Sequence, residues 1–166
     1  IRAALTGHLV FSTLHTNDAP SAVTRLVDMG VNPYLIASSI QAIMAQRLVR
    51  TICPECKEEY KPPEELLIEA EFPLDEAKNI TFYHGAGCEK CNYTGYKGRT
   101  GIFELLVMDE ELKGLVLKNV SSTQLRQVAR EHGMRTLRED GFKKVAMGVT
   151  TIVEVMRNTL AEKLEM

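Results

Sequence analysis

The chain has 166 residues, 45% of them hydrophobic, which is enough to bury a core for one domain and a small appendage. Its formal net charge is −2 and its pI is about 6.1, so no strongly basic field points to nucleic acid or anionic lipid. No apolar run approaches the ~20 residues that cross a bilayer and no signal peptide opens the chain, so we expect a cytoplasmic protein.

The opening residues predict a helix end followed by a buried strand. IRAAL, residues 1–5, has the pattern of the last turns of an amphipathic helix, so we expect a fragment of a longer protein. LVFSTL, residues 9–14, predicts a strand, because it is rich in large and β-branched residues and too short for a helix. A strand that is apolar on both faces is typical of the parallel sheets in α/β proteins.

A histidine lies at each end of this predicted strand. Ligands gather at the carboxyl ends of parallel strands, where His15 leaves the strand. For His15, contact with a ligand and bonding to loop backbone are equally good interpretations. His8 enters at the opposite end, roughly 20 Å away at 3.3 Å per residue, so the two rings cannot share one metal ion. For His8 we favour a purely structural role.

Start and stop signals divide the next residues into helices and a strand. The segment 34–46 is apolar on most of its circumference, which predicts a deeply buried helix. RLVRTI, residues 47–52, then predicts a short strand. Each predicted helix start combines a capping side chain with a proline. The first helix starts at Asn17 or Asp18 with Pro20 and ends at Gly30, and the second starts at Asn32 with Pro33.

The last third of the chain predicts a strand over 99–108 and then a bundle of helices. The apolar density of RTGIFELLVM favours the strand. Four helices follow, over 110–119, 125–133, 137–147 and 153–164. Their start signals are Asp109, a capping box of Ser121 and Gln124, Thr136, and a second capping box of Thr151 and Glu154.

The four cysteines form two C-x-x-C pairs, Cys53 with Cys56 and Cys88 with Cys91. Two such pairs complete a closed tetrahedral zinc site, which has a structural role because no coordination position stays open. Disulfides are disfavoured without a secretory signal, and a redox dithiol needs only one C-x-x-C at a helix start.

The residues around the cysteines, 53–97, differ in composition from the rest. They are charged and contain proline and glycine, which predicts an insert with its own architecture. We expect thiolate coordination to supply most of its folding free energy, so that Cys88→Ser unfolds it and leaves the C-terminal helices ordered. YKGR, residues 96–99, is either a solvated rim or a phosphate contact. A zinc-dependent protein- or nucleic-acid-binding module is therefore the alternative function.

Five stretches of the sequence, in this order, resemble the C-terminal part of the assembly ATPases of type II secretion and type IV pilus systems. They are TGHLVFSTLHTNDA, AVTRLVDMGV, AQRLVRTICPEC, GCEKCNYTGYKGRTGIFELL, and the region from Leu137 to Thr159 with EDG and VEVMRNT. The resemblance implies an α/β fold in three parts. These are a partial RecA-like parallel-sheet core over 1–52, a tetracysteine zinc insert over 53–97, and a return strand with a C-terminal helical subdomain over 98–166.

The resemblance also implies roles for the candidate residues. His15 would contact the terminal phosphates of ATP or sense their state, and His8 would belong to the same histidine box. Zinc would be bound by the four cysteines, Cys53, Cys56, Cys88 and Cys91.

The intact protein would be a homo-hexamer that uses ATP and Mg²⁺, located in the cytoplasm on the inner membrane. Its partners would be the platform and cytoplasmic-domain components of the machine, and not nucleic acid. The insert argues against a retraction motor, while secretion and pilus assembly stay open. No G-x-x-x-x-G-K-[ST] motif occurs in these residues, so we expect no ATP hydrolysis from the 166 residues alone.

Overall fold

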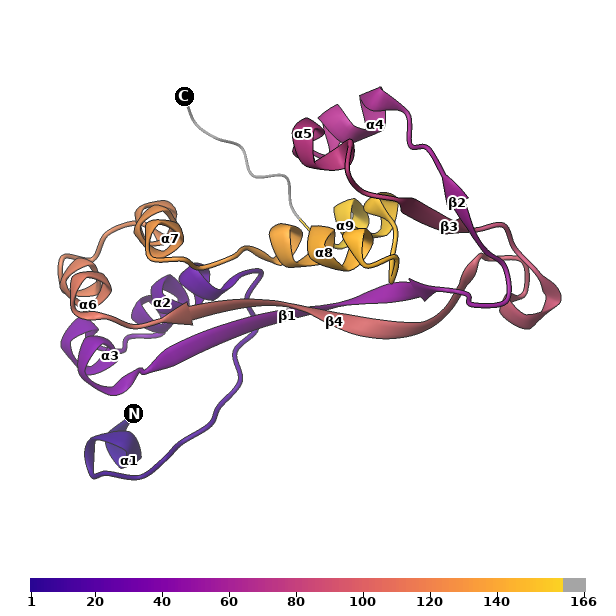
Figure 1. Ribbon diagram of the computed structural model, residues 1–166. Coiled ribbons are helices and arrows are strands. Elements are labelled where there is room, and N and C mark those ends of the chain that lie inside the picture. Colours follow the sequence, from indigo (N-terminus) through magenta and orange to yellow (C-terminus); the bar gives the residue numbers. More distant parts are fainter. Residues whose placement is uncertain (160–166) are drawn as a thin grey trace. The chain divides into compact units, whose positions relative to one another are not determined.

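The computed structural model describes residues 1–159, and it combines helices with two small sheets, as expected for the α/β class (Figure 1). The chain divides into two compact units. Unit 1 contains residues 1–46 and 104–136, and unit 2 contains residues 47–103 and the residues from 137 onward. The predicted insert, residues 53–97, lies entirely in unit 2.

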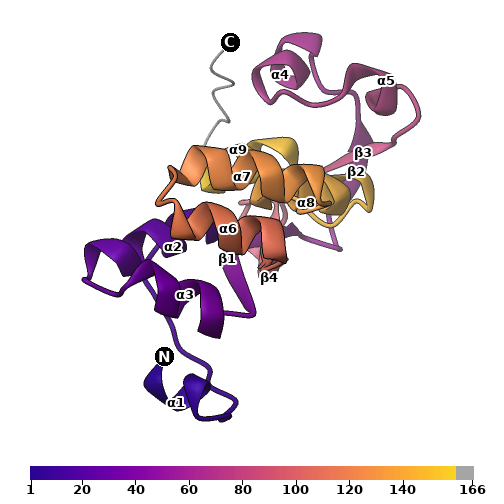
Figure 2. The same cartoon turned by 90° about the vertical axis from the view of Figure 1, so that its left-hand side faces the viewer.

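Unit 1 is largely helical (Figure 2). Helix α3 packs against α6, α2 packs against α7, and α6 packs against α7. An ion pair supports the second of these contacts, because Arg126 Nη2 lies 2.7 Å from Asp18 Oδ2 at the start of α2. The helices of this unit are α1 Arg2–Leu5, α2 Ala19–Asp28, α3 Pro33–Ser39, α6 Glu110–Leu117 and α7 Ser122–Glu131.

Up to residue 159, unit 2 combines a short hairpin-like sheet with four helices and a 3₁₀ turn. Strand β2 (Lys57–Tyr60) pairs antiparallel with β3 (Phe82–Gly85), with Lys57 opposite Gly85 and Tyr60 opposite Phe82. The remaining elements are α4 Glu64–Glu69, α5 Leu74–Ala77, the 3₁₀ turn η1 Glu89–Cys91, α8 Leu137–Ala146 and α9 Ile152–Asn158.

The predicted insert shares an apolar core with the C-terminal helices of unit 2. Phe72 packs on Phe82 and on Phe142, with ring centroids 5.6 and 4.8 Å apart. The other buried members of this cluster are Leu67, Ala70, Val145, Ile152 and Val155. The insert therefore gains stability from apolar burial as well as from any metal, which changes the expected effect of removing a thiolate.

Strands β1 (Ala42–Ile52) and β4 (Tyr96–Val107) pair with each other, and each belongs partly to both units. They confirm the strands predicted over 47–52 and 99–108. The predicted helix over 34–46 is wrong beyond Ser39, because the chain becomes extended at Ile40 and enters β1 at Ala42. Pairing with β4 overrides the helical periodicity of AIMAQ.

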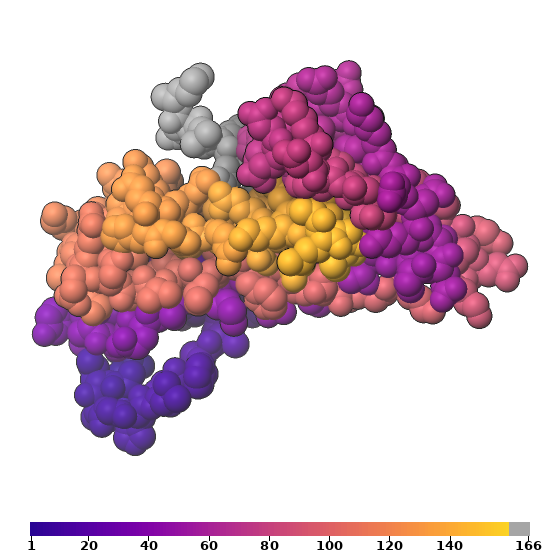
Figure 3. All heavy atoms as spheres, in the orientation of Figure 1, coloured from indigo at the N-terminus to yellow at the C-terminus, as the bar shows by residue number. Residues whose placement is uncertain are grey.

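The predicted strand over 9–14 is absent. Residues 8–16 form neither helix nor strand, and no strand within residues 1–159 pairs with them. The apolar side chains of this segment are exposed, Leu9 to 85% and Phe11 to 88%. The segment, with α1, projects from the rest of unit 1 in Figure 3. A strand requires a neighbour for its backbone donors and acceptors, and apolar content alone does not supply one.

Most of the predicted helix starts are confirmed. Asp18, Asn32, Asp109 and Ser121 each accept a hydrogen bond from a backbone N–H in the first turn of the following helix. Thr151 caps α9, but the Glu154 carboxylate leaves the predicted capping box and bonds to Arg50 instead. The helix predicted over 153–164 ends at Asn158, and its residues 160–164 lie outside the described part. Within residues 1–159, every helix is too short or too polar to cross a membrane.

Candidate metal centre

The structure brings the four cysteine side chains to one point of unit 2. Cys53 follows β1, Cys56 precedes β2, and Cys88 and Cys91 lie at the two ends of the turn η1. All four sulfurs lie within 4.8 Å of one another, and all four are free thiols.

The separations of the sulfurs match a tetrahedral metal site. Zn–S bonds of about 2.3 Å place the corners of a tetrahedron about 3.8 Å apart. The Sγ atoms of Cys53 and Cys88 are 3.9 Å apart, those of Cys56 and Cys91 are 3.9 Å apart, and those of Cys88 and Cys91 are 3.8 Å apart. These distances are too long for disulfides, whose S–S bond is about 2.05 Å. The donor set and its spacing therefore fit a tetrahedral ion such as zinc.

Backbone N–H groups point at two of the sulfurs. Cys88 N and Gly95 N donate to Cys91 Sγ at 3.2 and 3.3 Å, and Gly87 N donates to Cys56 Sγ at 3.3 Å. The donors from Cys88 and Gly95 lower the pKa of the Cys91 thiol to about 6. Burial raises the pKa of the Cys56 thiol to about 12. A bound metal selects the thiolate form, so loading such a site releases protons.

Two glycines permit the close packing of the two cysteine loops. Cys53 N donates to Gly95 O at 2.9 Å, and Ala86 N donates to Cys56 O at 2.9 Å. A Cβ at Gly85 would collide with the backbone carbonyl of Gly95, and Gly95 itself has φ +75°. Only glycine adopts that φ readily and leaves room for such an approach.

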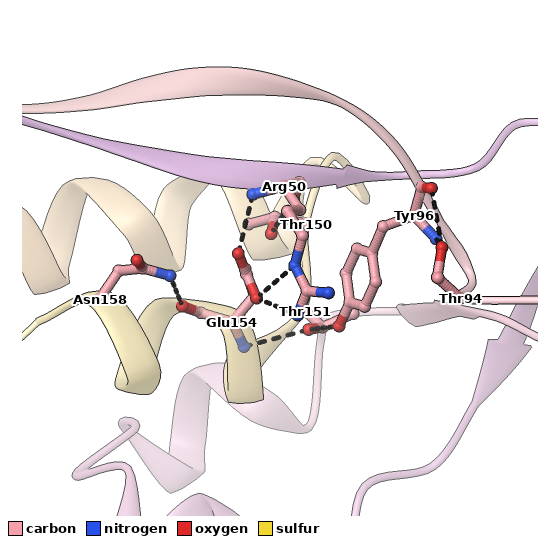
Figure 4. Close-up of polar contacts among 7 residues, drawn as sticks. All are labelled: Arg50, Thr94, Tyr96, Thr150, Thr151, Glu154 and Asn158. Atoms are coloured by element: carbon pink, nitrogen blue, oxygen red, sulfur yellow. Dashed lines mark hydrogen bonds and ion pairs between the residues drawn. The ribbon is translucent and has the colours of Figure 1, made fainter. Parts of the chain in front are cut away.

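Figure 4 shows a polar network, not predicted from the sequence, among Arg50, Tyr96, Thr151 and Glu154. Arg50 Nε and Nη2 donate to Glu154 Oε2 at 3.0 and 2.6 Å, and Arg50 N donates to Glu154 Oε1 at 3.0 Å. The Arg50 guanidinium lies 4.1 Å from the centroid of the Tyr96 ring. The Tyr96 hydroxyl is 2.7 Å from Thr151 Oγ1, and that oxygen accepts from Glu154 N.

This network revises the interpretation of two sequence motifs. Within YKGR, the Tyr96 hydroxyl points at α9, so only Lys97 and Arg99 remain as exposed surface groups. In TTIVEV, the T-x-x-E spacing cannot tell whether the Glu154 carboxylate closes a capping box or bonds to a distant residue instead. An arginine on a strand 104 positions away gives no signal in a local pattern.

The two histidines are not brought together with the cysteines. Both lie in unit 1, and both are exposed. The His8 ring has local contacts at the end of α1, with Nδ1 3.0 Å from Thr6 Oγ1 and 3.2 Å from Ala3 O. His15 lies in the irregular segment before α2, and its ring has no hydrogen-bond or ion-pair partner among the described residues.

Comparison with known proteins identifies the family. The model for the type II/IV secretion system protein family matches residues 1–157. The chain belongs to this family. It is 48% identical to the type IV pilus assembly ATPase PilB of Thermus thermophilus, a match that covers 95% of this chain and 18% of the relative. It is 47% identical to the type II secretion system protein E of Pseudomonas aeruginosa, covering 98% of this chain and 32% of the relative.

A solved structure shows a similar fold. The pilus retraction motor PilT with bound ADP matches with a TM-score of 0.61 and 24% identity, over 98% of this chain and 35% of that one. The likeness to PilT concerns the fold alone. The chain spans less than a third of the length of each of these two relatives, PilB and protein E.

Proposed function

We propose that this chain is the C-terminal part of a hexameric ATPase that powers type II protein secretion or type IV pilus assembly. The family match over residues 1–157 carries the proposal. It is supported by relatives named as a type IV pilus assembly ATPase and a type II secretion ATPase, at 48% and 46% identity. ATP and Mg²⁺ are then cofactors of the intact protein, and the Walker A lysine lies outside these 166 residues, because they contain no such motif.

The metal of this part is zinc, held by Cys53, Cys56, Cys88 and Cys91. The four sulfurs fit the corners of a zinc–thiolate tetrahedron, and the N–H donors to Cys91 favour its thiolate form. Four protein ligands leave no position for water or substrate, so the ion is structural. What the chain itself does is hold two loops, 53–56 and 88–91, in a fixed relation.

His15 is the residue that meets the phosphates of ATP in the intact hexamer. It is exposed in the segment before α2, and its ring is not committed to another described side chain. A neutral imidazole can donate a hydrogen bond to a phosphate oxygen and lose it on hydrolysis. His8 belongs to the same box with a smaller role, since its ring already bonds within the α1 turn.

The location and partners follow from this function. The intact protein works in the cytoplasm against the inner membrane, as a homo-hexamer docked on the platform and cytoplasmic-domain components of the machine. The proposed domains are the ATPase core at 1–52, the zinc insert at 53–97 and the C-terminal helical subdomain at 98–166. The alternative, a nucleic-acid-binding zinc module, retains only Lys97 and Arg99 of its predicted surface.

The decisive experiment compares the intact protein with its His15→Ala and His8→Ala variants in a Mg²⁺-dependent ATPase assay. We expect His15→Ala to lower kcat by about 10- to 100-fold, because one phosphate contact is lost, and His8→Ala to lower it less. The 166-residue chain assayed alone should show no turnover above background. Robust hydrolysis by the short chain, or full activity of His15→Ala, would contradict the proposal.

Zinc content is tested separately on the 166-residue chain. Metal analysis should find one zinc ion per chain, and Cys88→Ser should lose it. A salt titration with DNA and RNA then tests the alternative, because binding through phosphates weakens steeply with added salt. We expect no salt-sensitive binding.

A further inference from the structure

We infer that Tyr96 is a positioning residue that couples the cysteine cluster to helix α9. The inference rests on the proposed zinc site but goes beyond it, because it assigns a residue outside the ligand set to metal affinity. Every contact that carries it lies within unit 2.

The first link joins the cluster to the backbone of Tyr96. Thr94 Oγ1 donates to Cys91 O at 2.6 Å and accepts from Tyr96 N at 3.3 Å. Between them, Gly95 N donates to Cys91 Sγ at 3.3 Å. Residues 91–96 therefore form one hydrogen-bonded turn, and the position of the Cys91 sulfur fixes where the Tyr96 side chain begins.

The second link joins the side chain of Tyr96 to α9 (Figure 4). Its hydroxyl lies 2.7 Å from Thr151 Oγ1, the N-cap of α9, and its ring lies under the Arg50 guanidinium. Arg50 in turn pairs with Glu154 in the first turn of α9. Tyr96 thus holds the start of α9 through two routes, one through the Thr151 hydroxyl and one through the Arg50–Glu154 pair.

Coupling of this kind is reciprocal. If zinc binding orders the cysteine loops and so stabilises the contacts to α9, then loss of one of these contacts lowers the affinity for zinc by the same factor. One hydrogen bond is worth about 1 kcal/mol, which is about fivefold in a dissociation constant. The result is a zinc site whose affinity depends on a hydroxyl that never touches the metal.

The test uses Tyr96→Phe, which keeps the ring over Arg50 and removes only the hydroxyl. Tyr93→Phe is the matched control, because Tyr93 lies in the same turn and is 73% exposed, whereas it is the Tyr96 hydroxyl that bonds to Thr151. Zinc dissociation constants come from chelator competition, and hydrogen exchange of residues 150–158 is measured with and without zinc. We expect Tyr96→Phe to bind zinc about fivefold more weakly, while Tyr93→Phe is unchanged.

Exchange provides a readout that does not depend on the metal assay. Removal of zinc should accelerate exchange in α9 of the parent chain, and this response should be smaller in Tyr96→Phe. Thr151→Val removes the same hydrogen bond together with the N-cap of α9, so it should weaken zinc binding at least as much as Tyr96→Phe, and Thr151→Ser should keep parent behaviour because it retains the hydroxyl.

The possible outcomes separate this inference from the zinc proposal. The coupling is refuted, and the zinc proposal stands, if the parent binds one zinc ion and Tyr96→Phe binds it equally tightly. The same holds if the rate of hydrogen exchange in α9 is the same with and without zinc. If the parent binds no zinc, both fall.

Discussion

Arg50 and Glu154, 104 positions apart in the sequence, are joined by three hydrogen bonds, two from the guanidinium and one from the Arg50 backbone N–H. The Glu154 side chain is 4% exposed and the Arg50 side chain 38%. Burial opposes the ionisation of Glu154, but the bonds from Arg50 outweigh it and hold the pKa of this carboxyl below its ordinary value of 4.5. The pair therefore fixes α9 to β1 within unit 2.

Glu154→Gln should destabilise unit 2, because it removes the charge from a buried pair and leaves Arg50 without its counter-ion. We expect a loss of about 2–3 kcal/mol in the free energy of unfolding, measured by urea denaturation at pH 7. Asp75→Asn is the matched control: the same change of acid to amide in the exposed Lys78–Asp75 pair should cost almost nothing. Equal effects of the two substitutions would contradict a special role for Glu154.

The same pair predicts a dependence on acid. A depressed folded pKa means that the contribution of Glu154 is complete above about pH 4.5, the ordinary value, and is lost as pH falls through the lower folded pKa. The stability difference between the parent and Glu154→Gln should therefore shrink in that acidic range. A difference that stays constant down to pH 2 would show that the carboxylate charge is not what stabilises α9.

His132 should give unit 1 the opposite dependence on pH. Its Nδ1 lies 2.5 Å from Asp109 Oδ2 and its Nε2 lies 3.2 Å from Glu111 Oε2. The hydrogen bond with Asp109, against the cost of burial, raises the pKa of His132 above 6.5. Because the folded pKa is raised, the contribution of His132 to the stability of the folded state is complete below about pH 6.5, and it is lost as pH rises through the folded pKa.

The measurement for His132 is an NMR titration of its ring, together with thermal melts between pH 5 and 9. Asp109→Asn should bring the pKa down and flatten the pH dependence of melting, while the asparagine still caps α6 by accepting from Leu112 N. A ring that titrates identically in the parent and in Asp109→Asn would disprove the ion pair.

Removal of one thiolate should disorder only part of the insert. The sequence alone leads to the expectation that Cys88→Ser unfolds residues 53–97, but Phe72 packs on both Phe82 and Phe142 in an apolar core. We now expect proteolysis of Cys88→Ser to open 53–57 and 85–96 and to spare α4 and α5. Mass spectrometry of the fragments maps the cuts.

Phe72→Ala is the complementary variant. Truncation of this buried ring should cost about 3–4 kcal/mol and expose α4 and α5 to protease, while zinc stays bound. If Cys88→Ser and Phe72→Ala gave the same cleavage pattern, the insert would be one cooperative unit and the division proposed here would be wrong.

Substitution of Gly85 tests the geometry of the metal centre, and substitution of Gly114 in α6 is its control. Gly85→Ala places a Cβ against the Gly95 carbonyl, so we expect a loss of at least about 2 kcal/mol and weaker zinc binding. Gly114→Ala, within α6, meets nothing within 4 Å and should stabilise by about 0.5–1 kcal/mol. Thermal melts with and without zinc compare the two. Unchanged zinc affinity in Gly85→Ala would mean that the two cysteine loops need not approach so closely.

Local signals in the sequence predicted local structure well. Asp18, Asn32, Asp109 and Ser121 cap the helices that they were expected to cap, because a capping side chain bonds to backbone only two or three residues away. The family likeness is likewise carried by contiguous stretches of sequence, and the comparisons confirm it. The cysteine pairs were recognised as a metal site from their spacing, and their sulfurs do converge.

The failures concern elements whose conformation depends on distant partners. LVFSTL has the composition of a strand but no neighbour within residues 1–159, and AIMAQ has a helical period but pairs with β4. Glu154 has the spacing of a capping box, yet a guanidinium 104 positions away offers its carboxylate a stronger, charge-assisted bond.

Sequence alone was enough for the family, for most of the helix starts and for the four cysteines that could hold a metal, because each of these depends on residue type and short spacing. Only the tertiary structure shows which strands pair, that Phe72 and Phe82 share a core with Phe142, and that the Tyr96 hydroxyl bonds to Thr151 at the start of α9. The physical reason is that such contacts join residues far apart in the chain, so their free energy exists only once the backbone has brought them together.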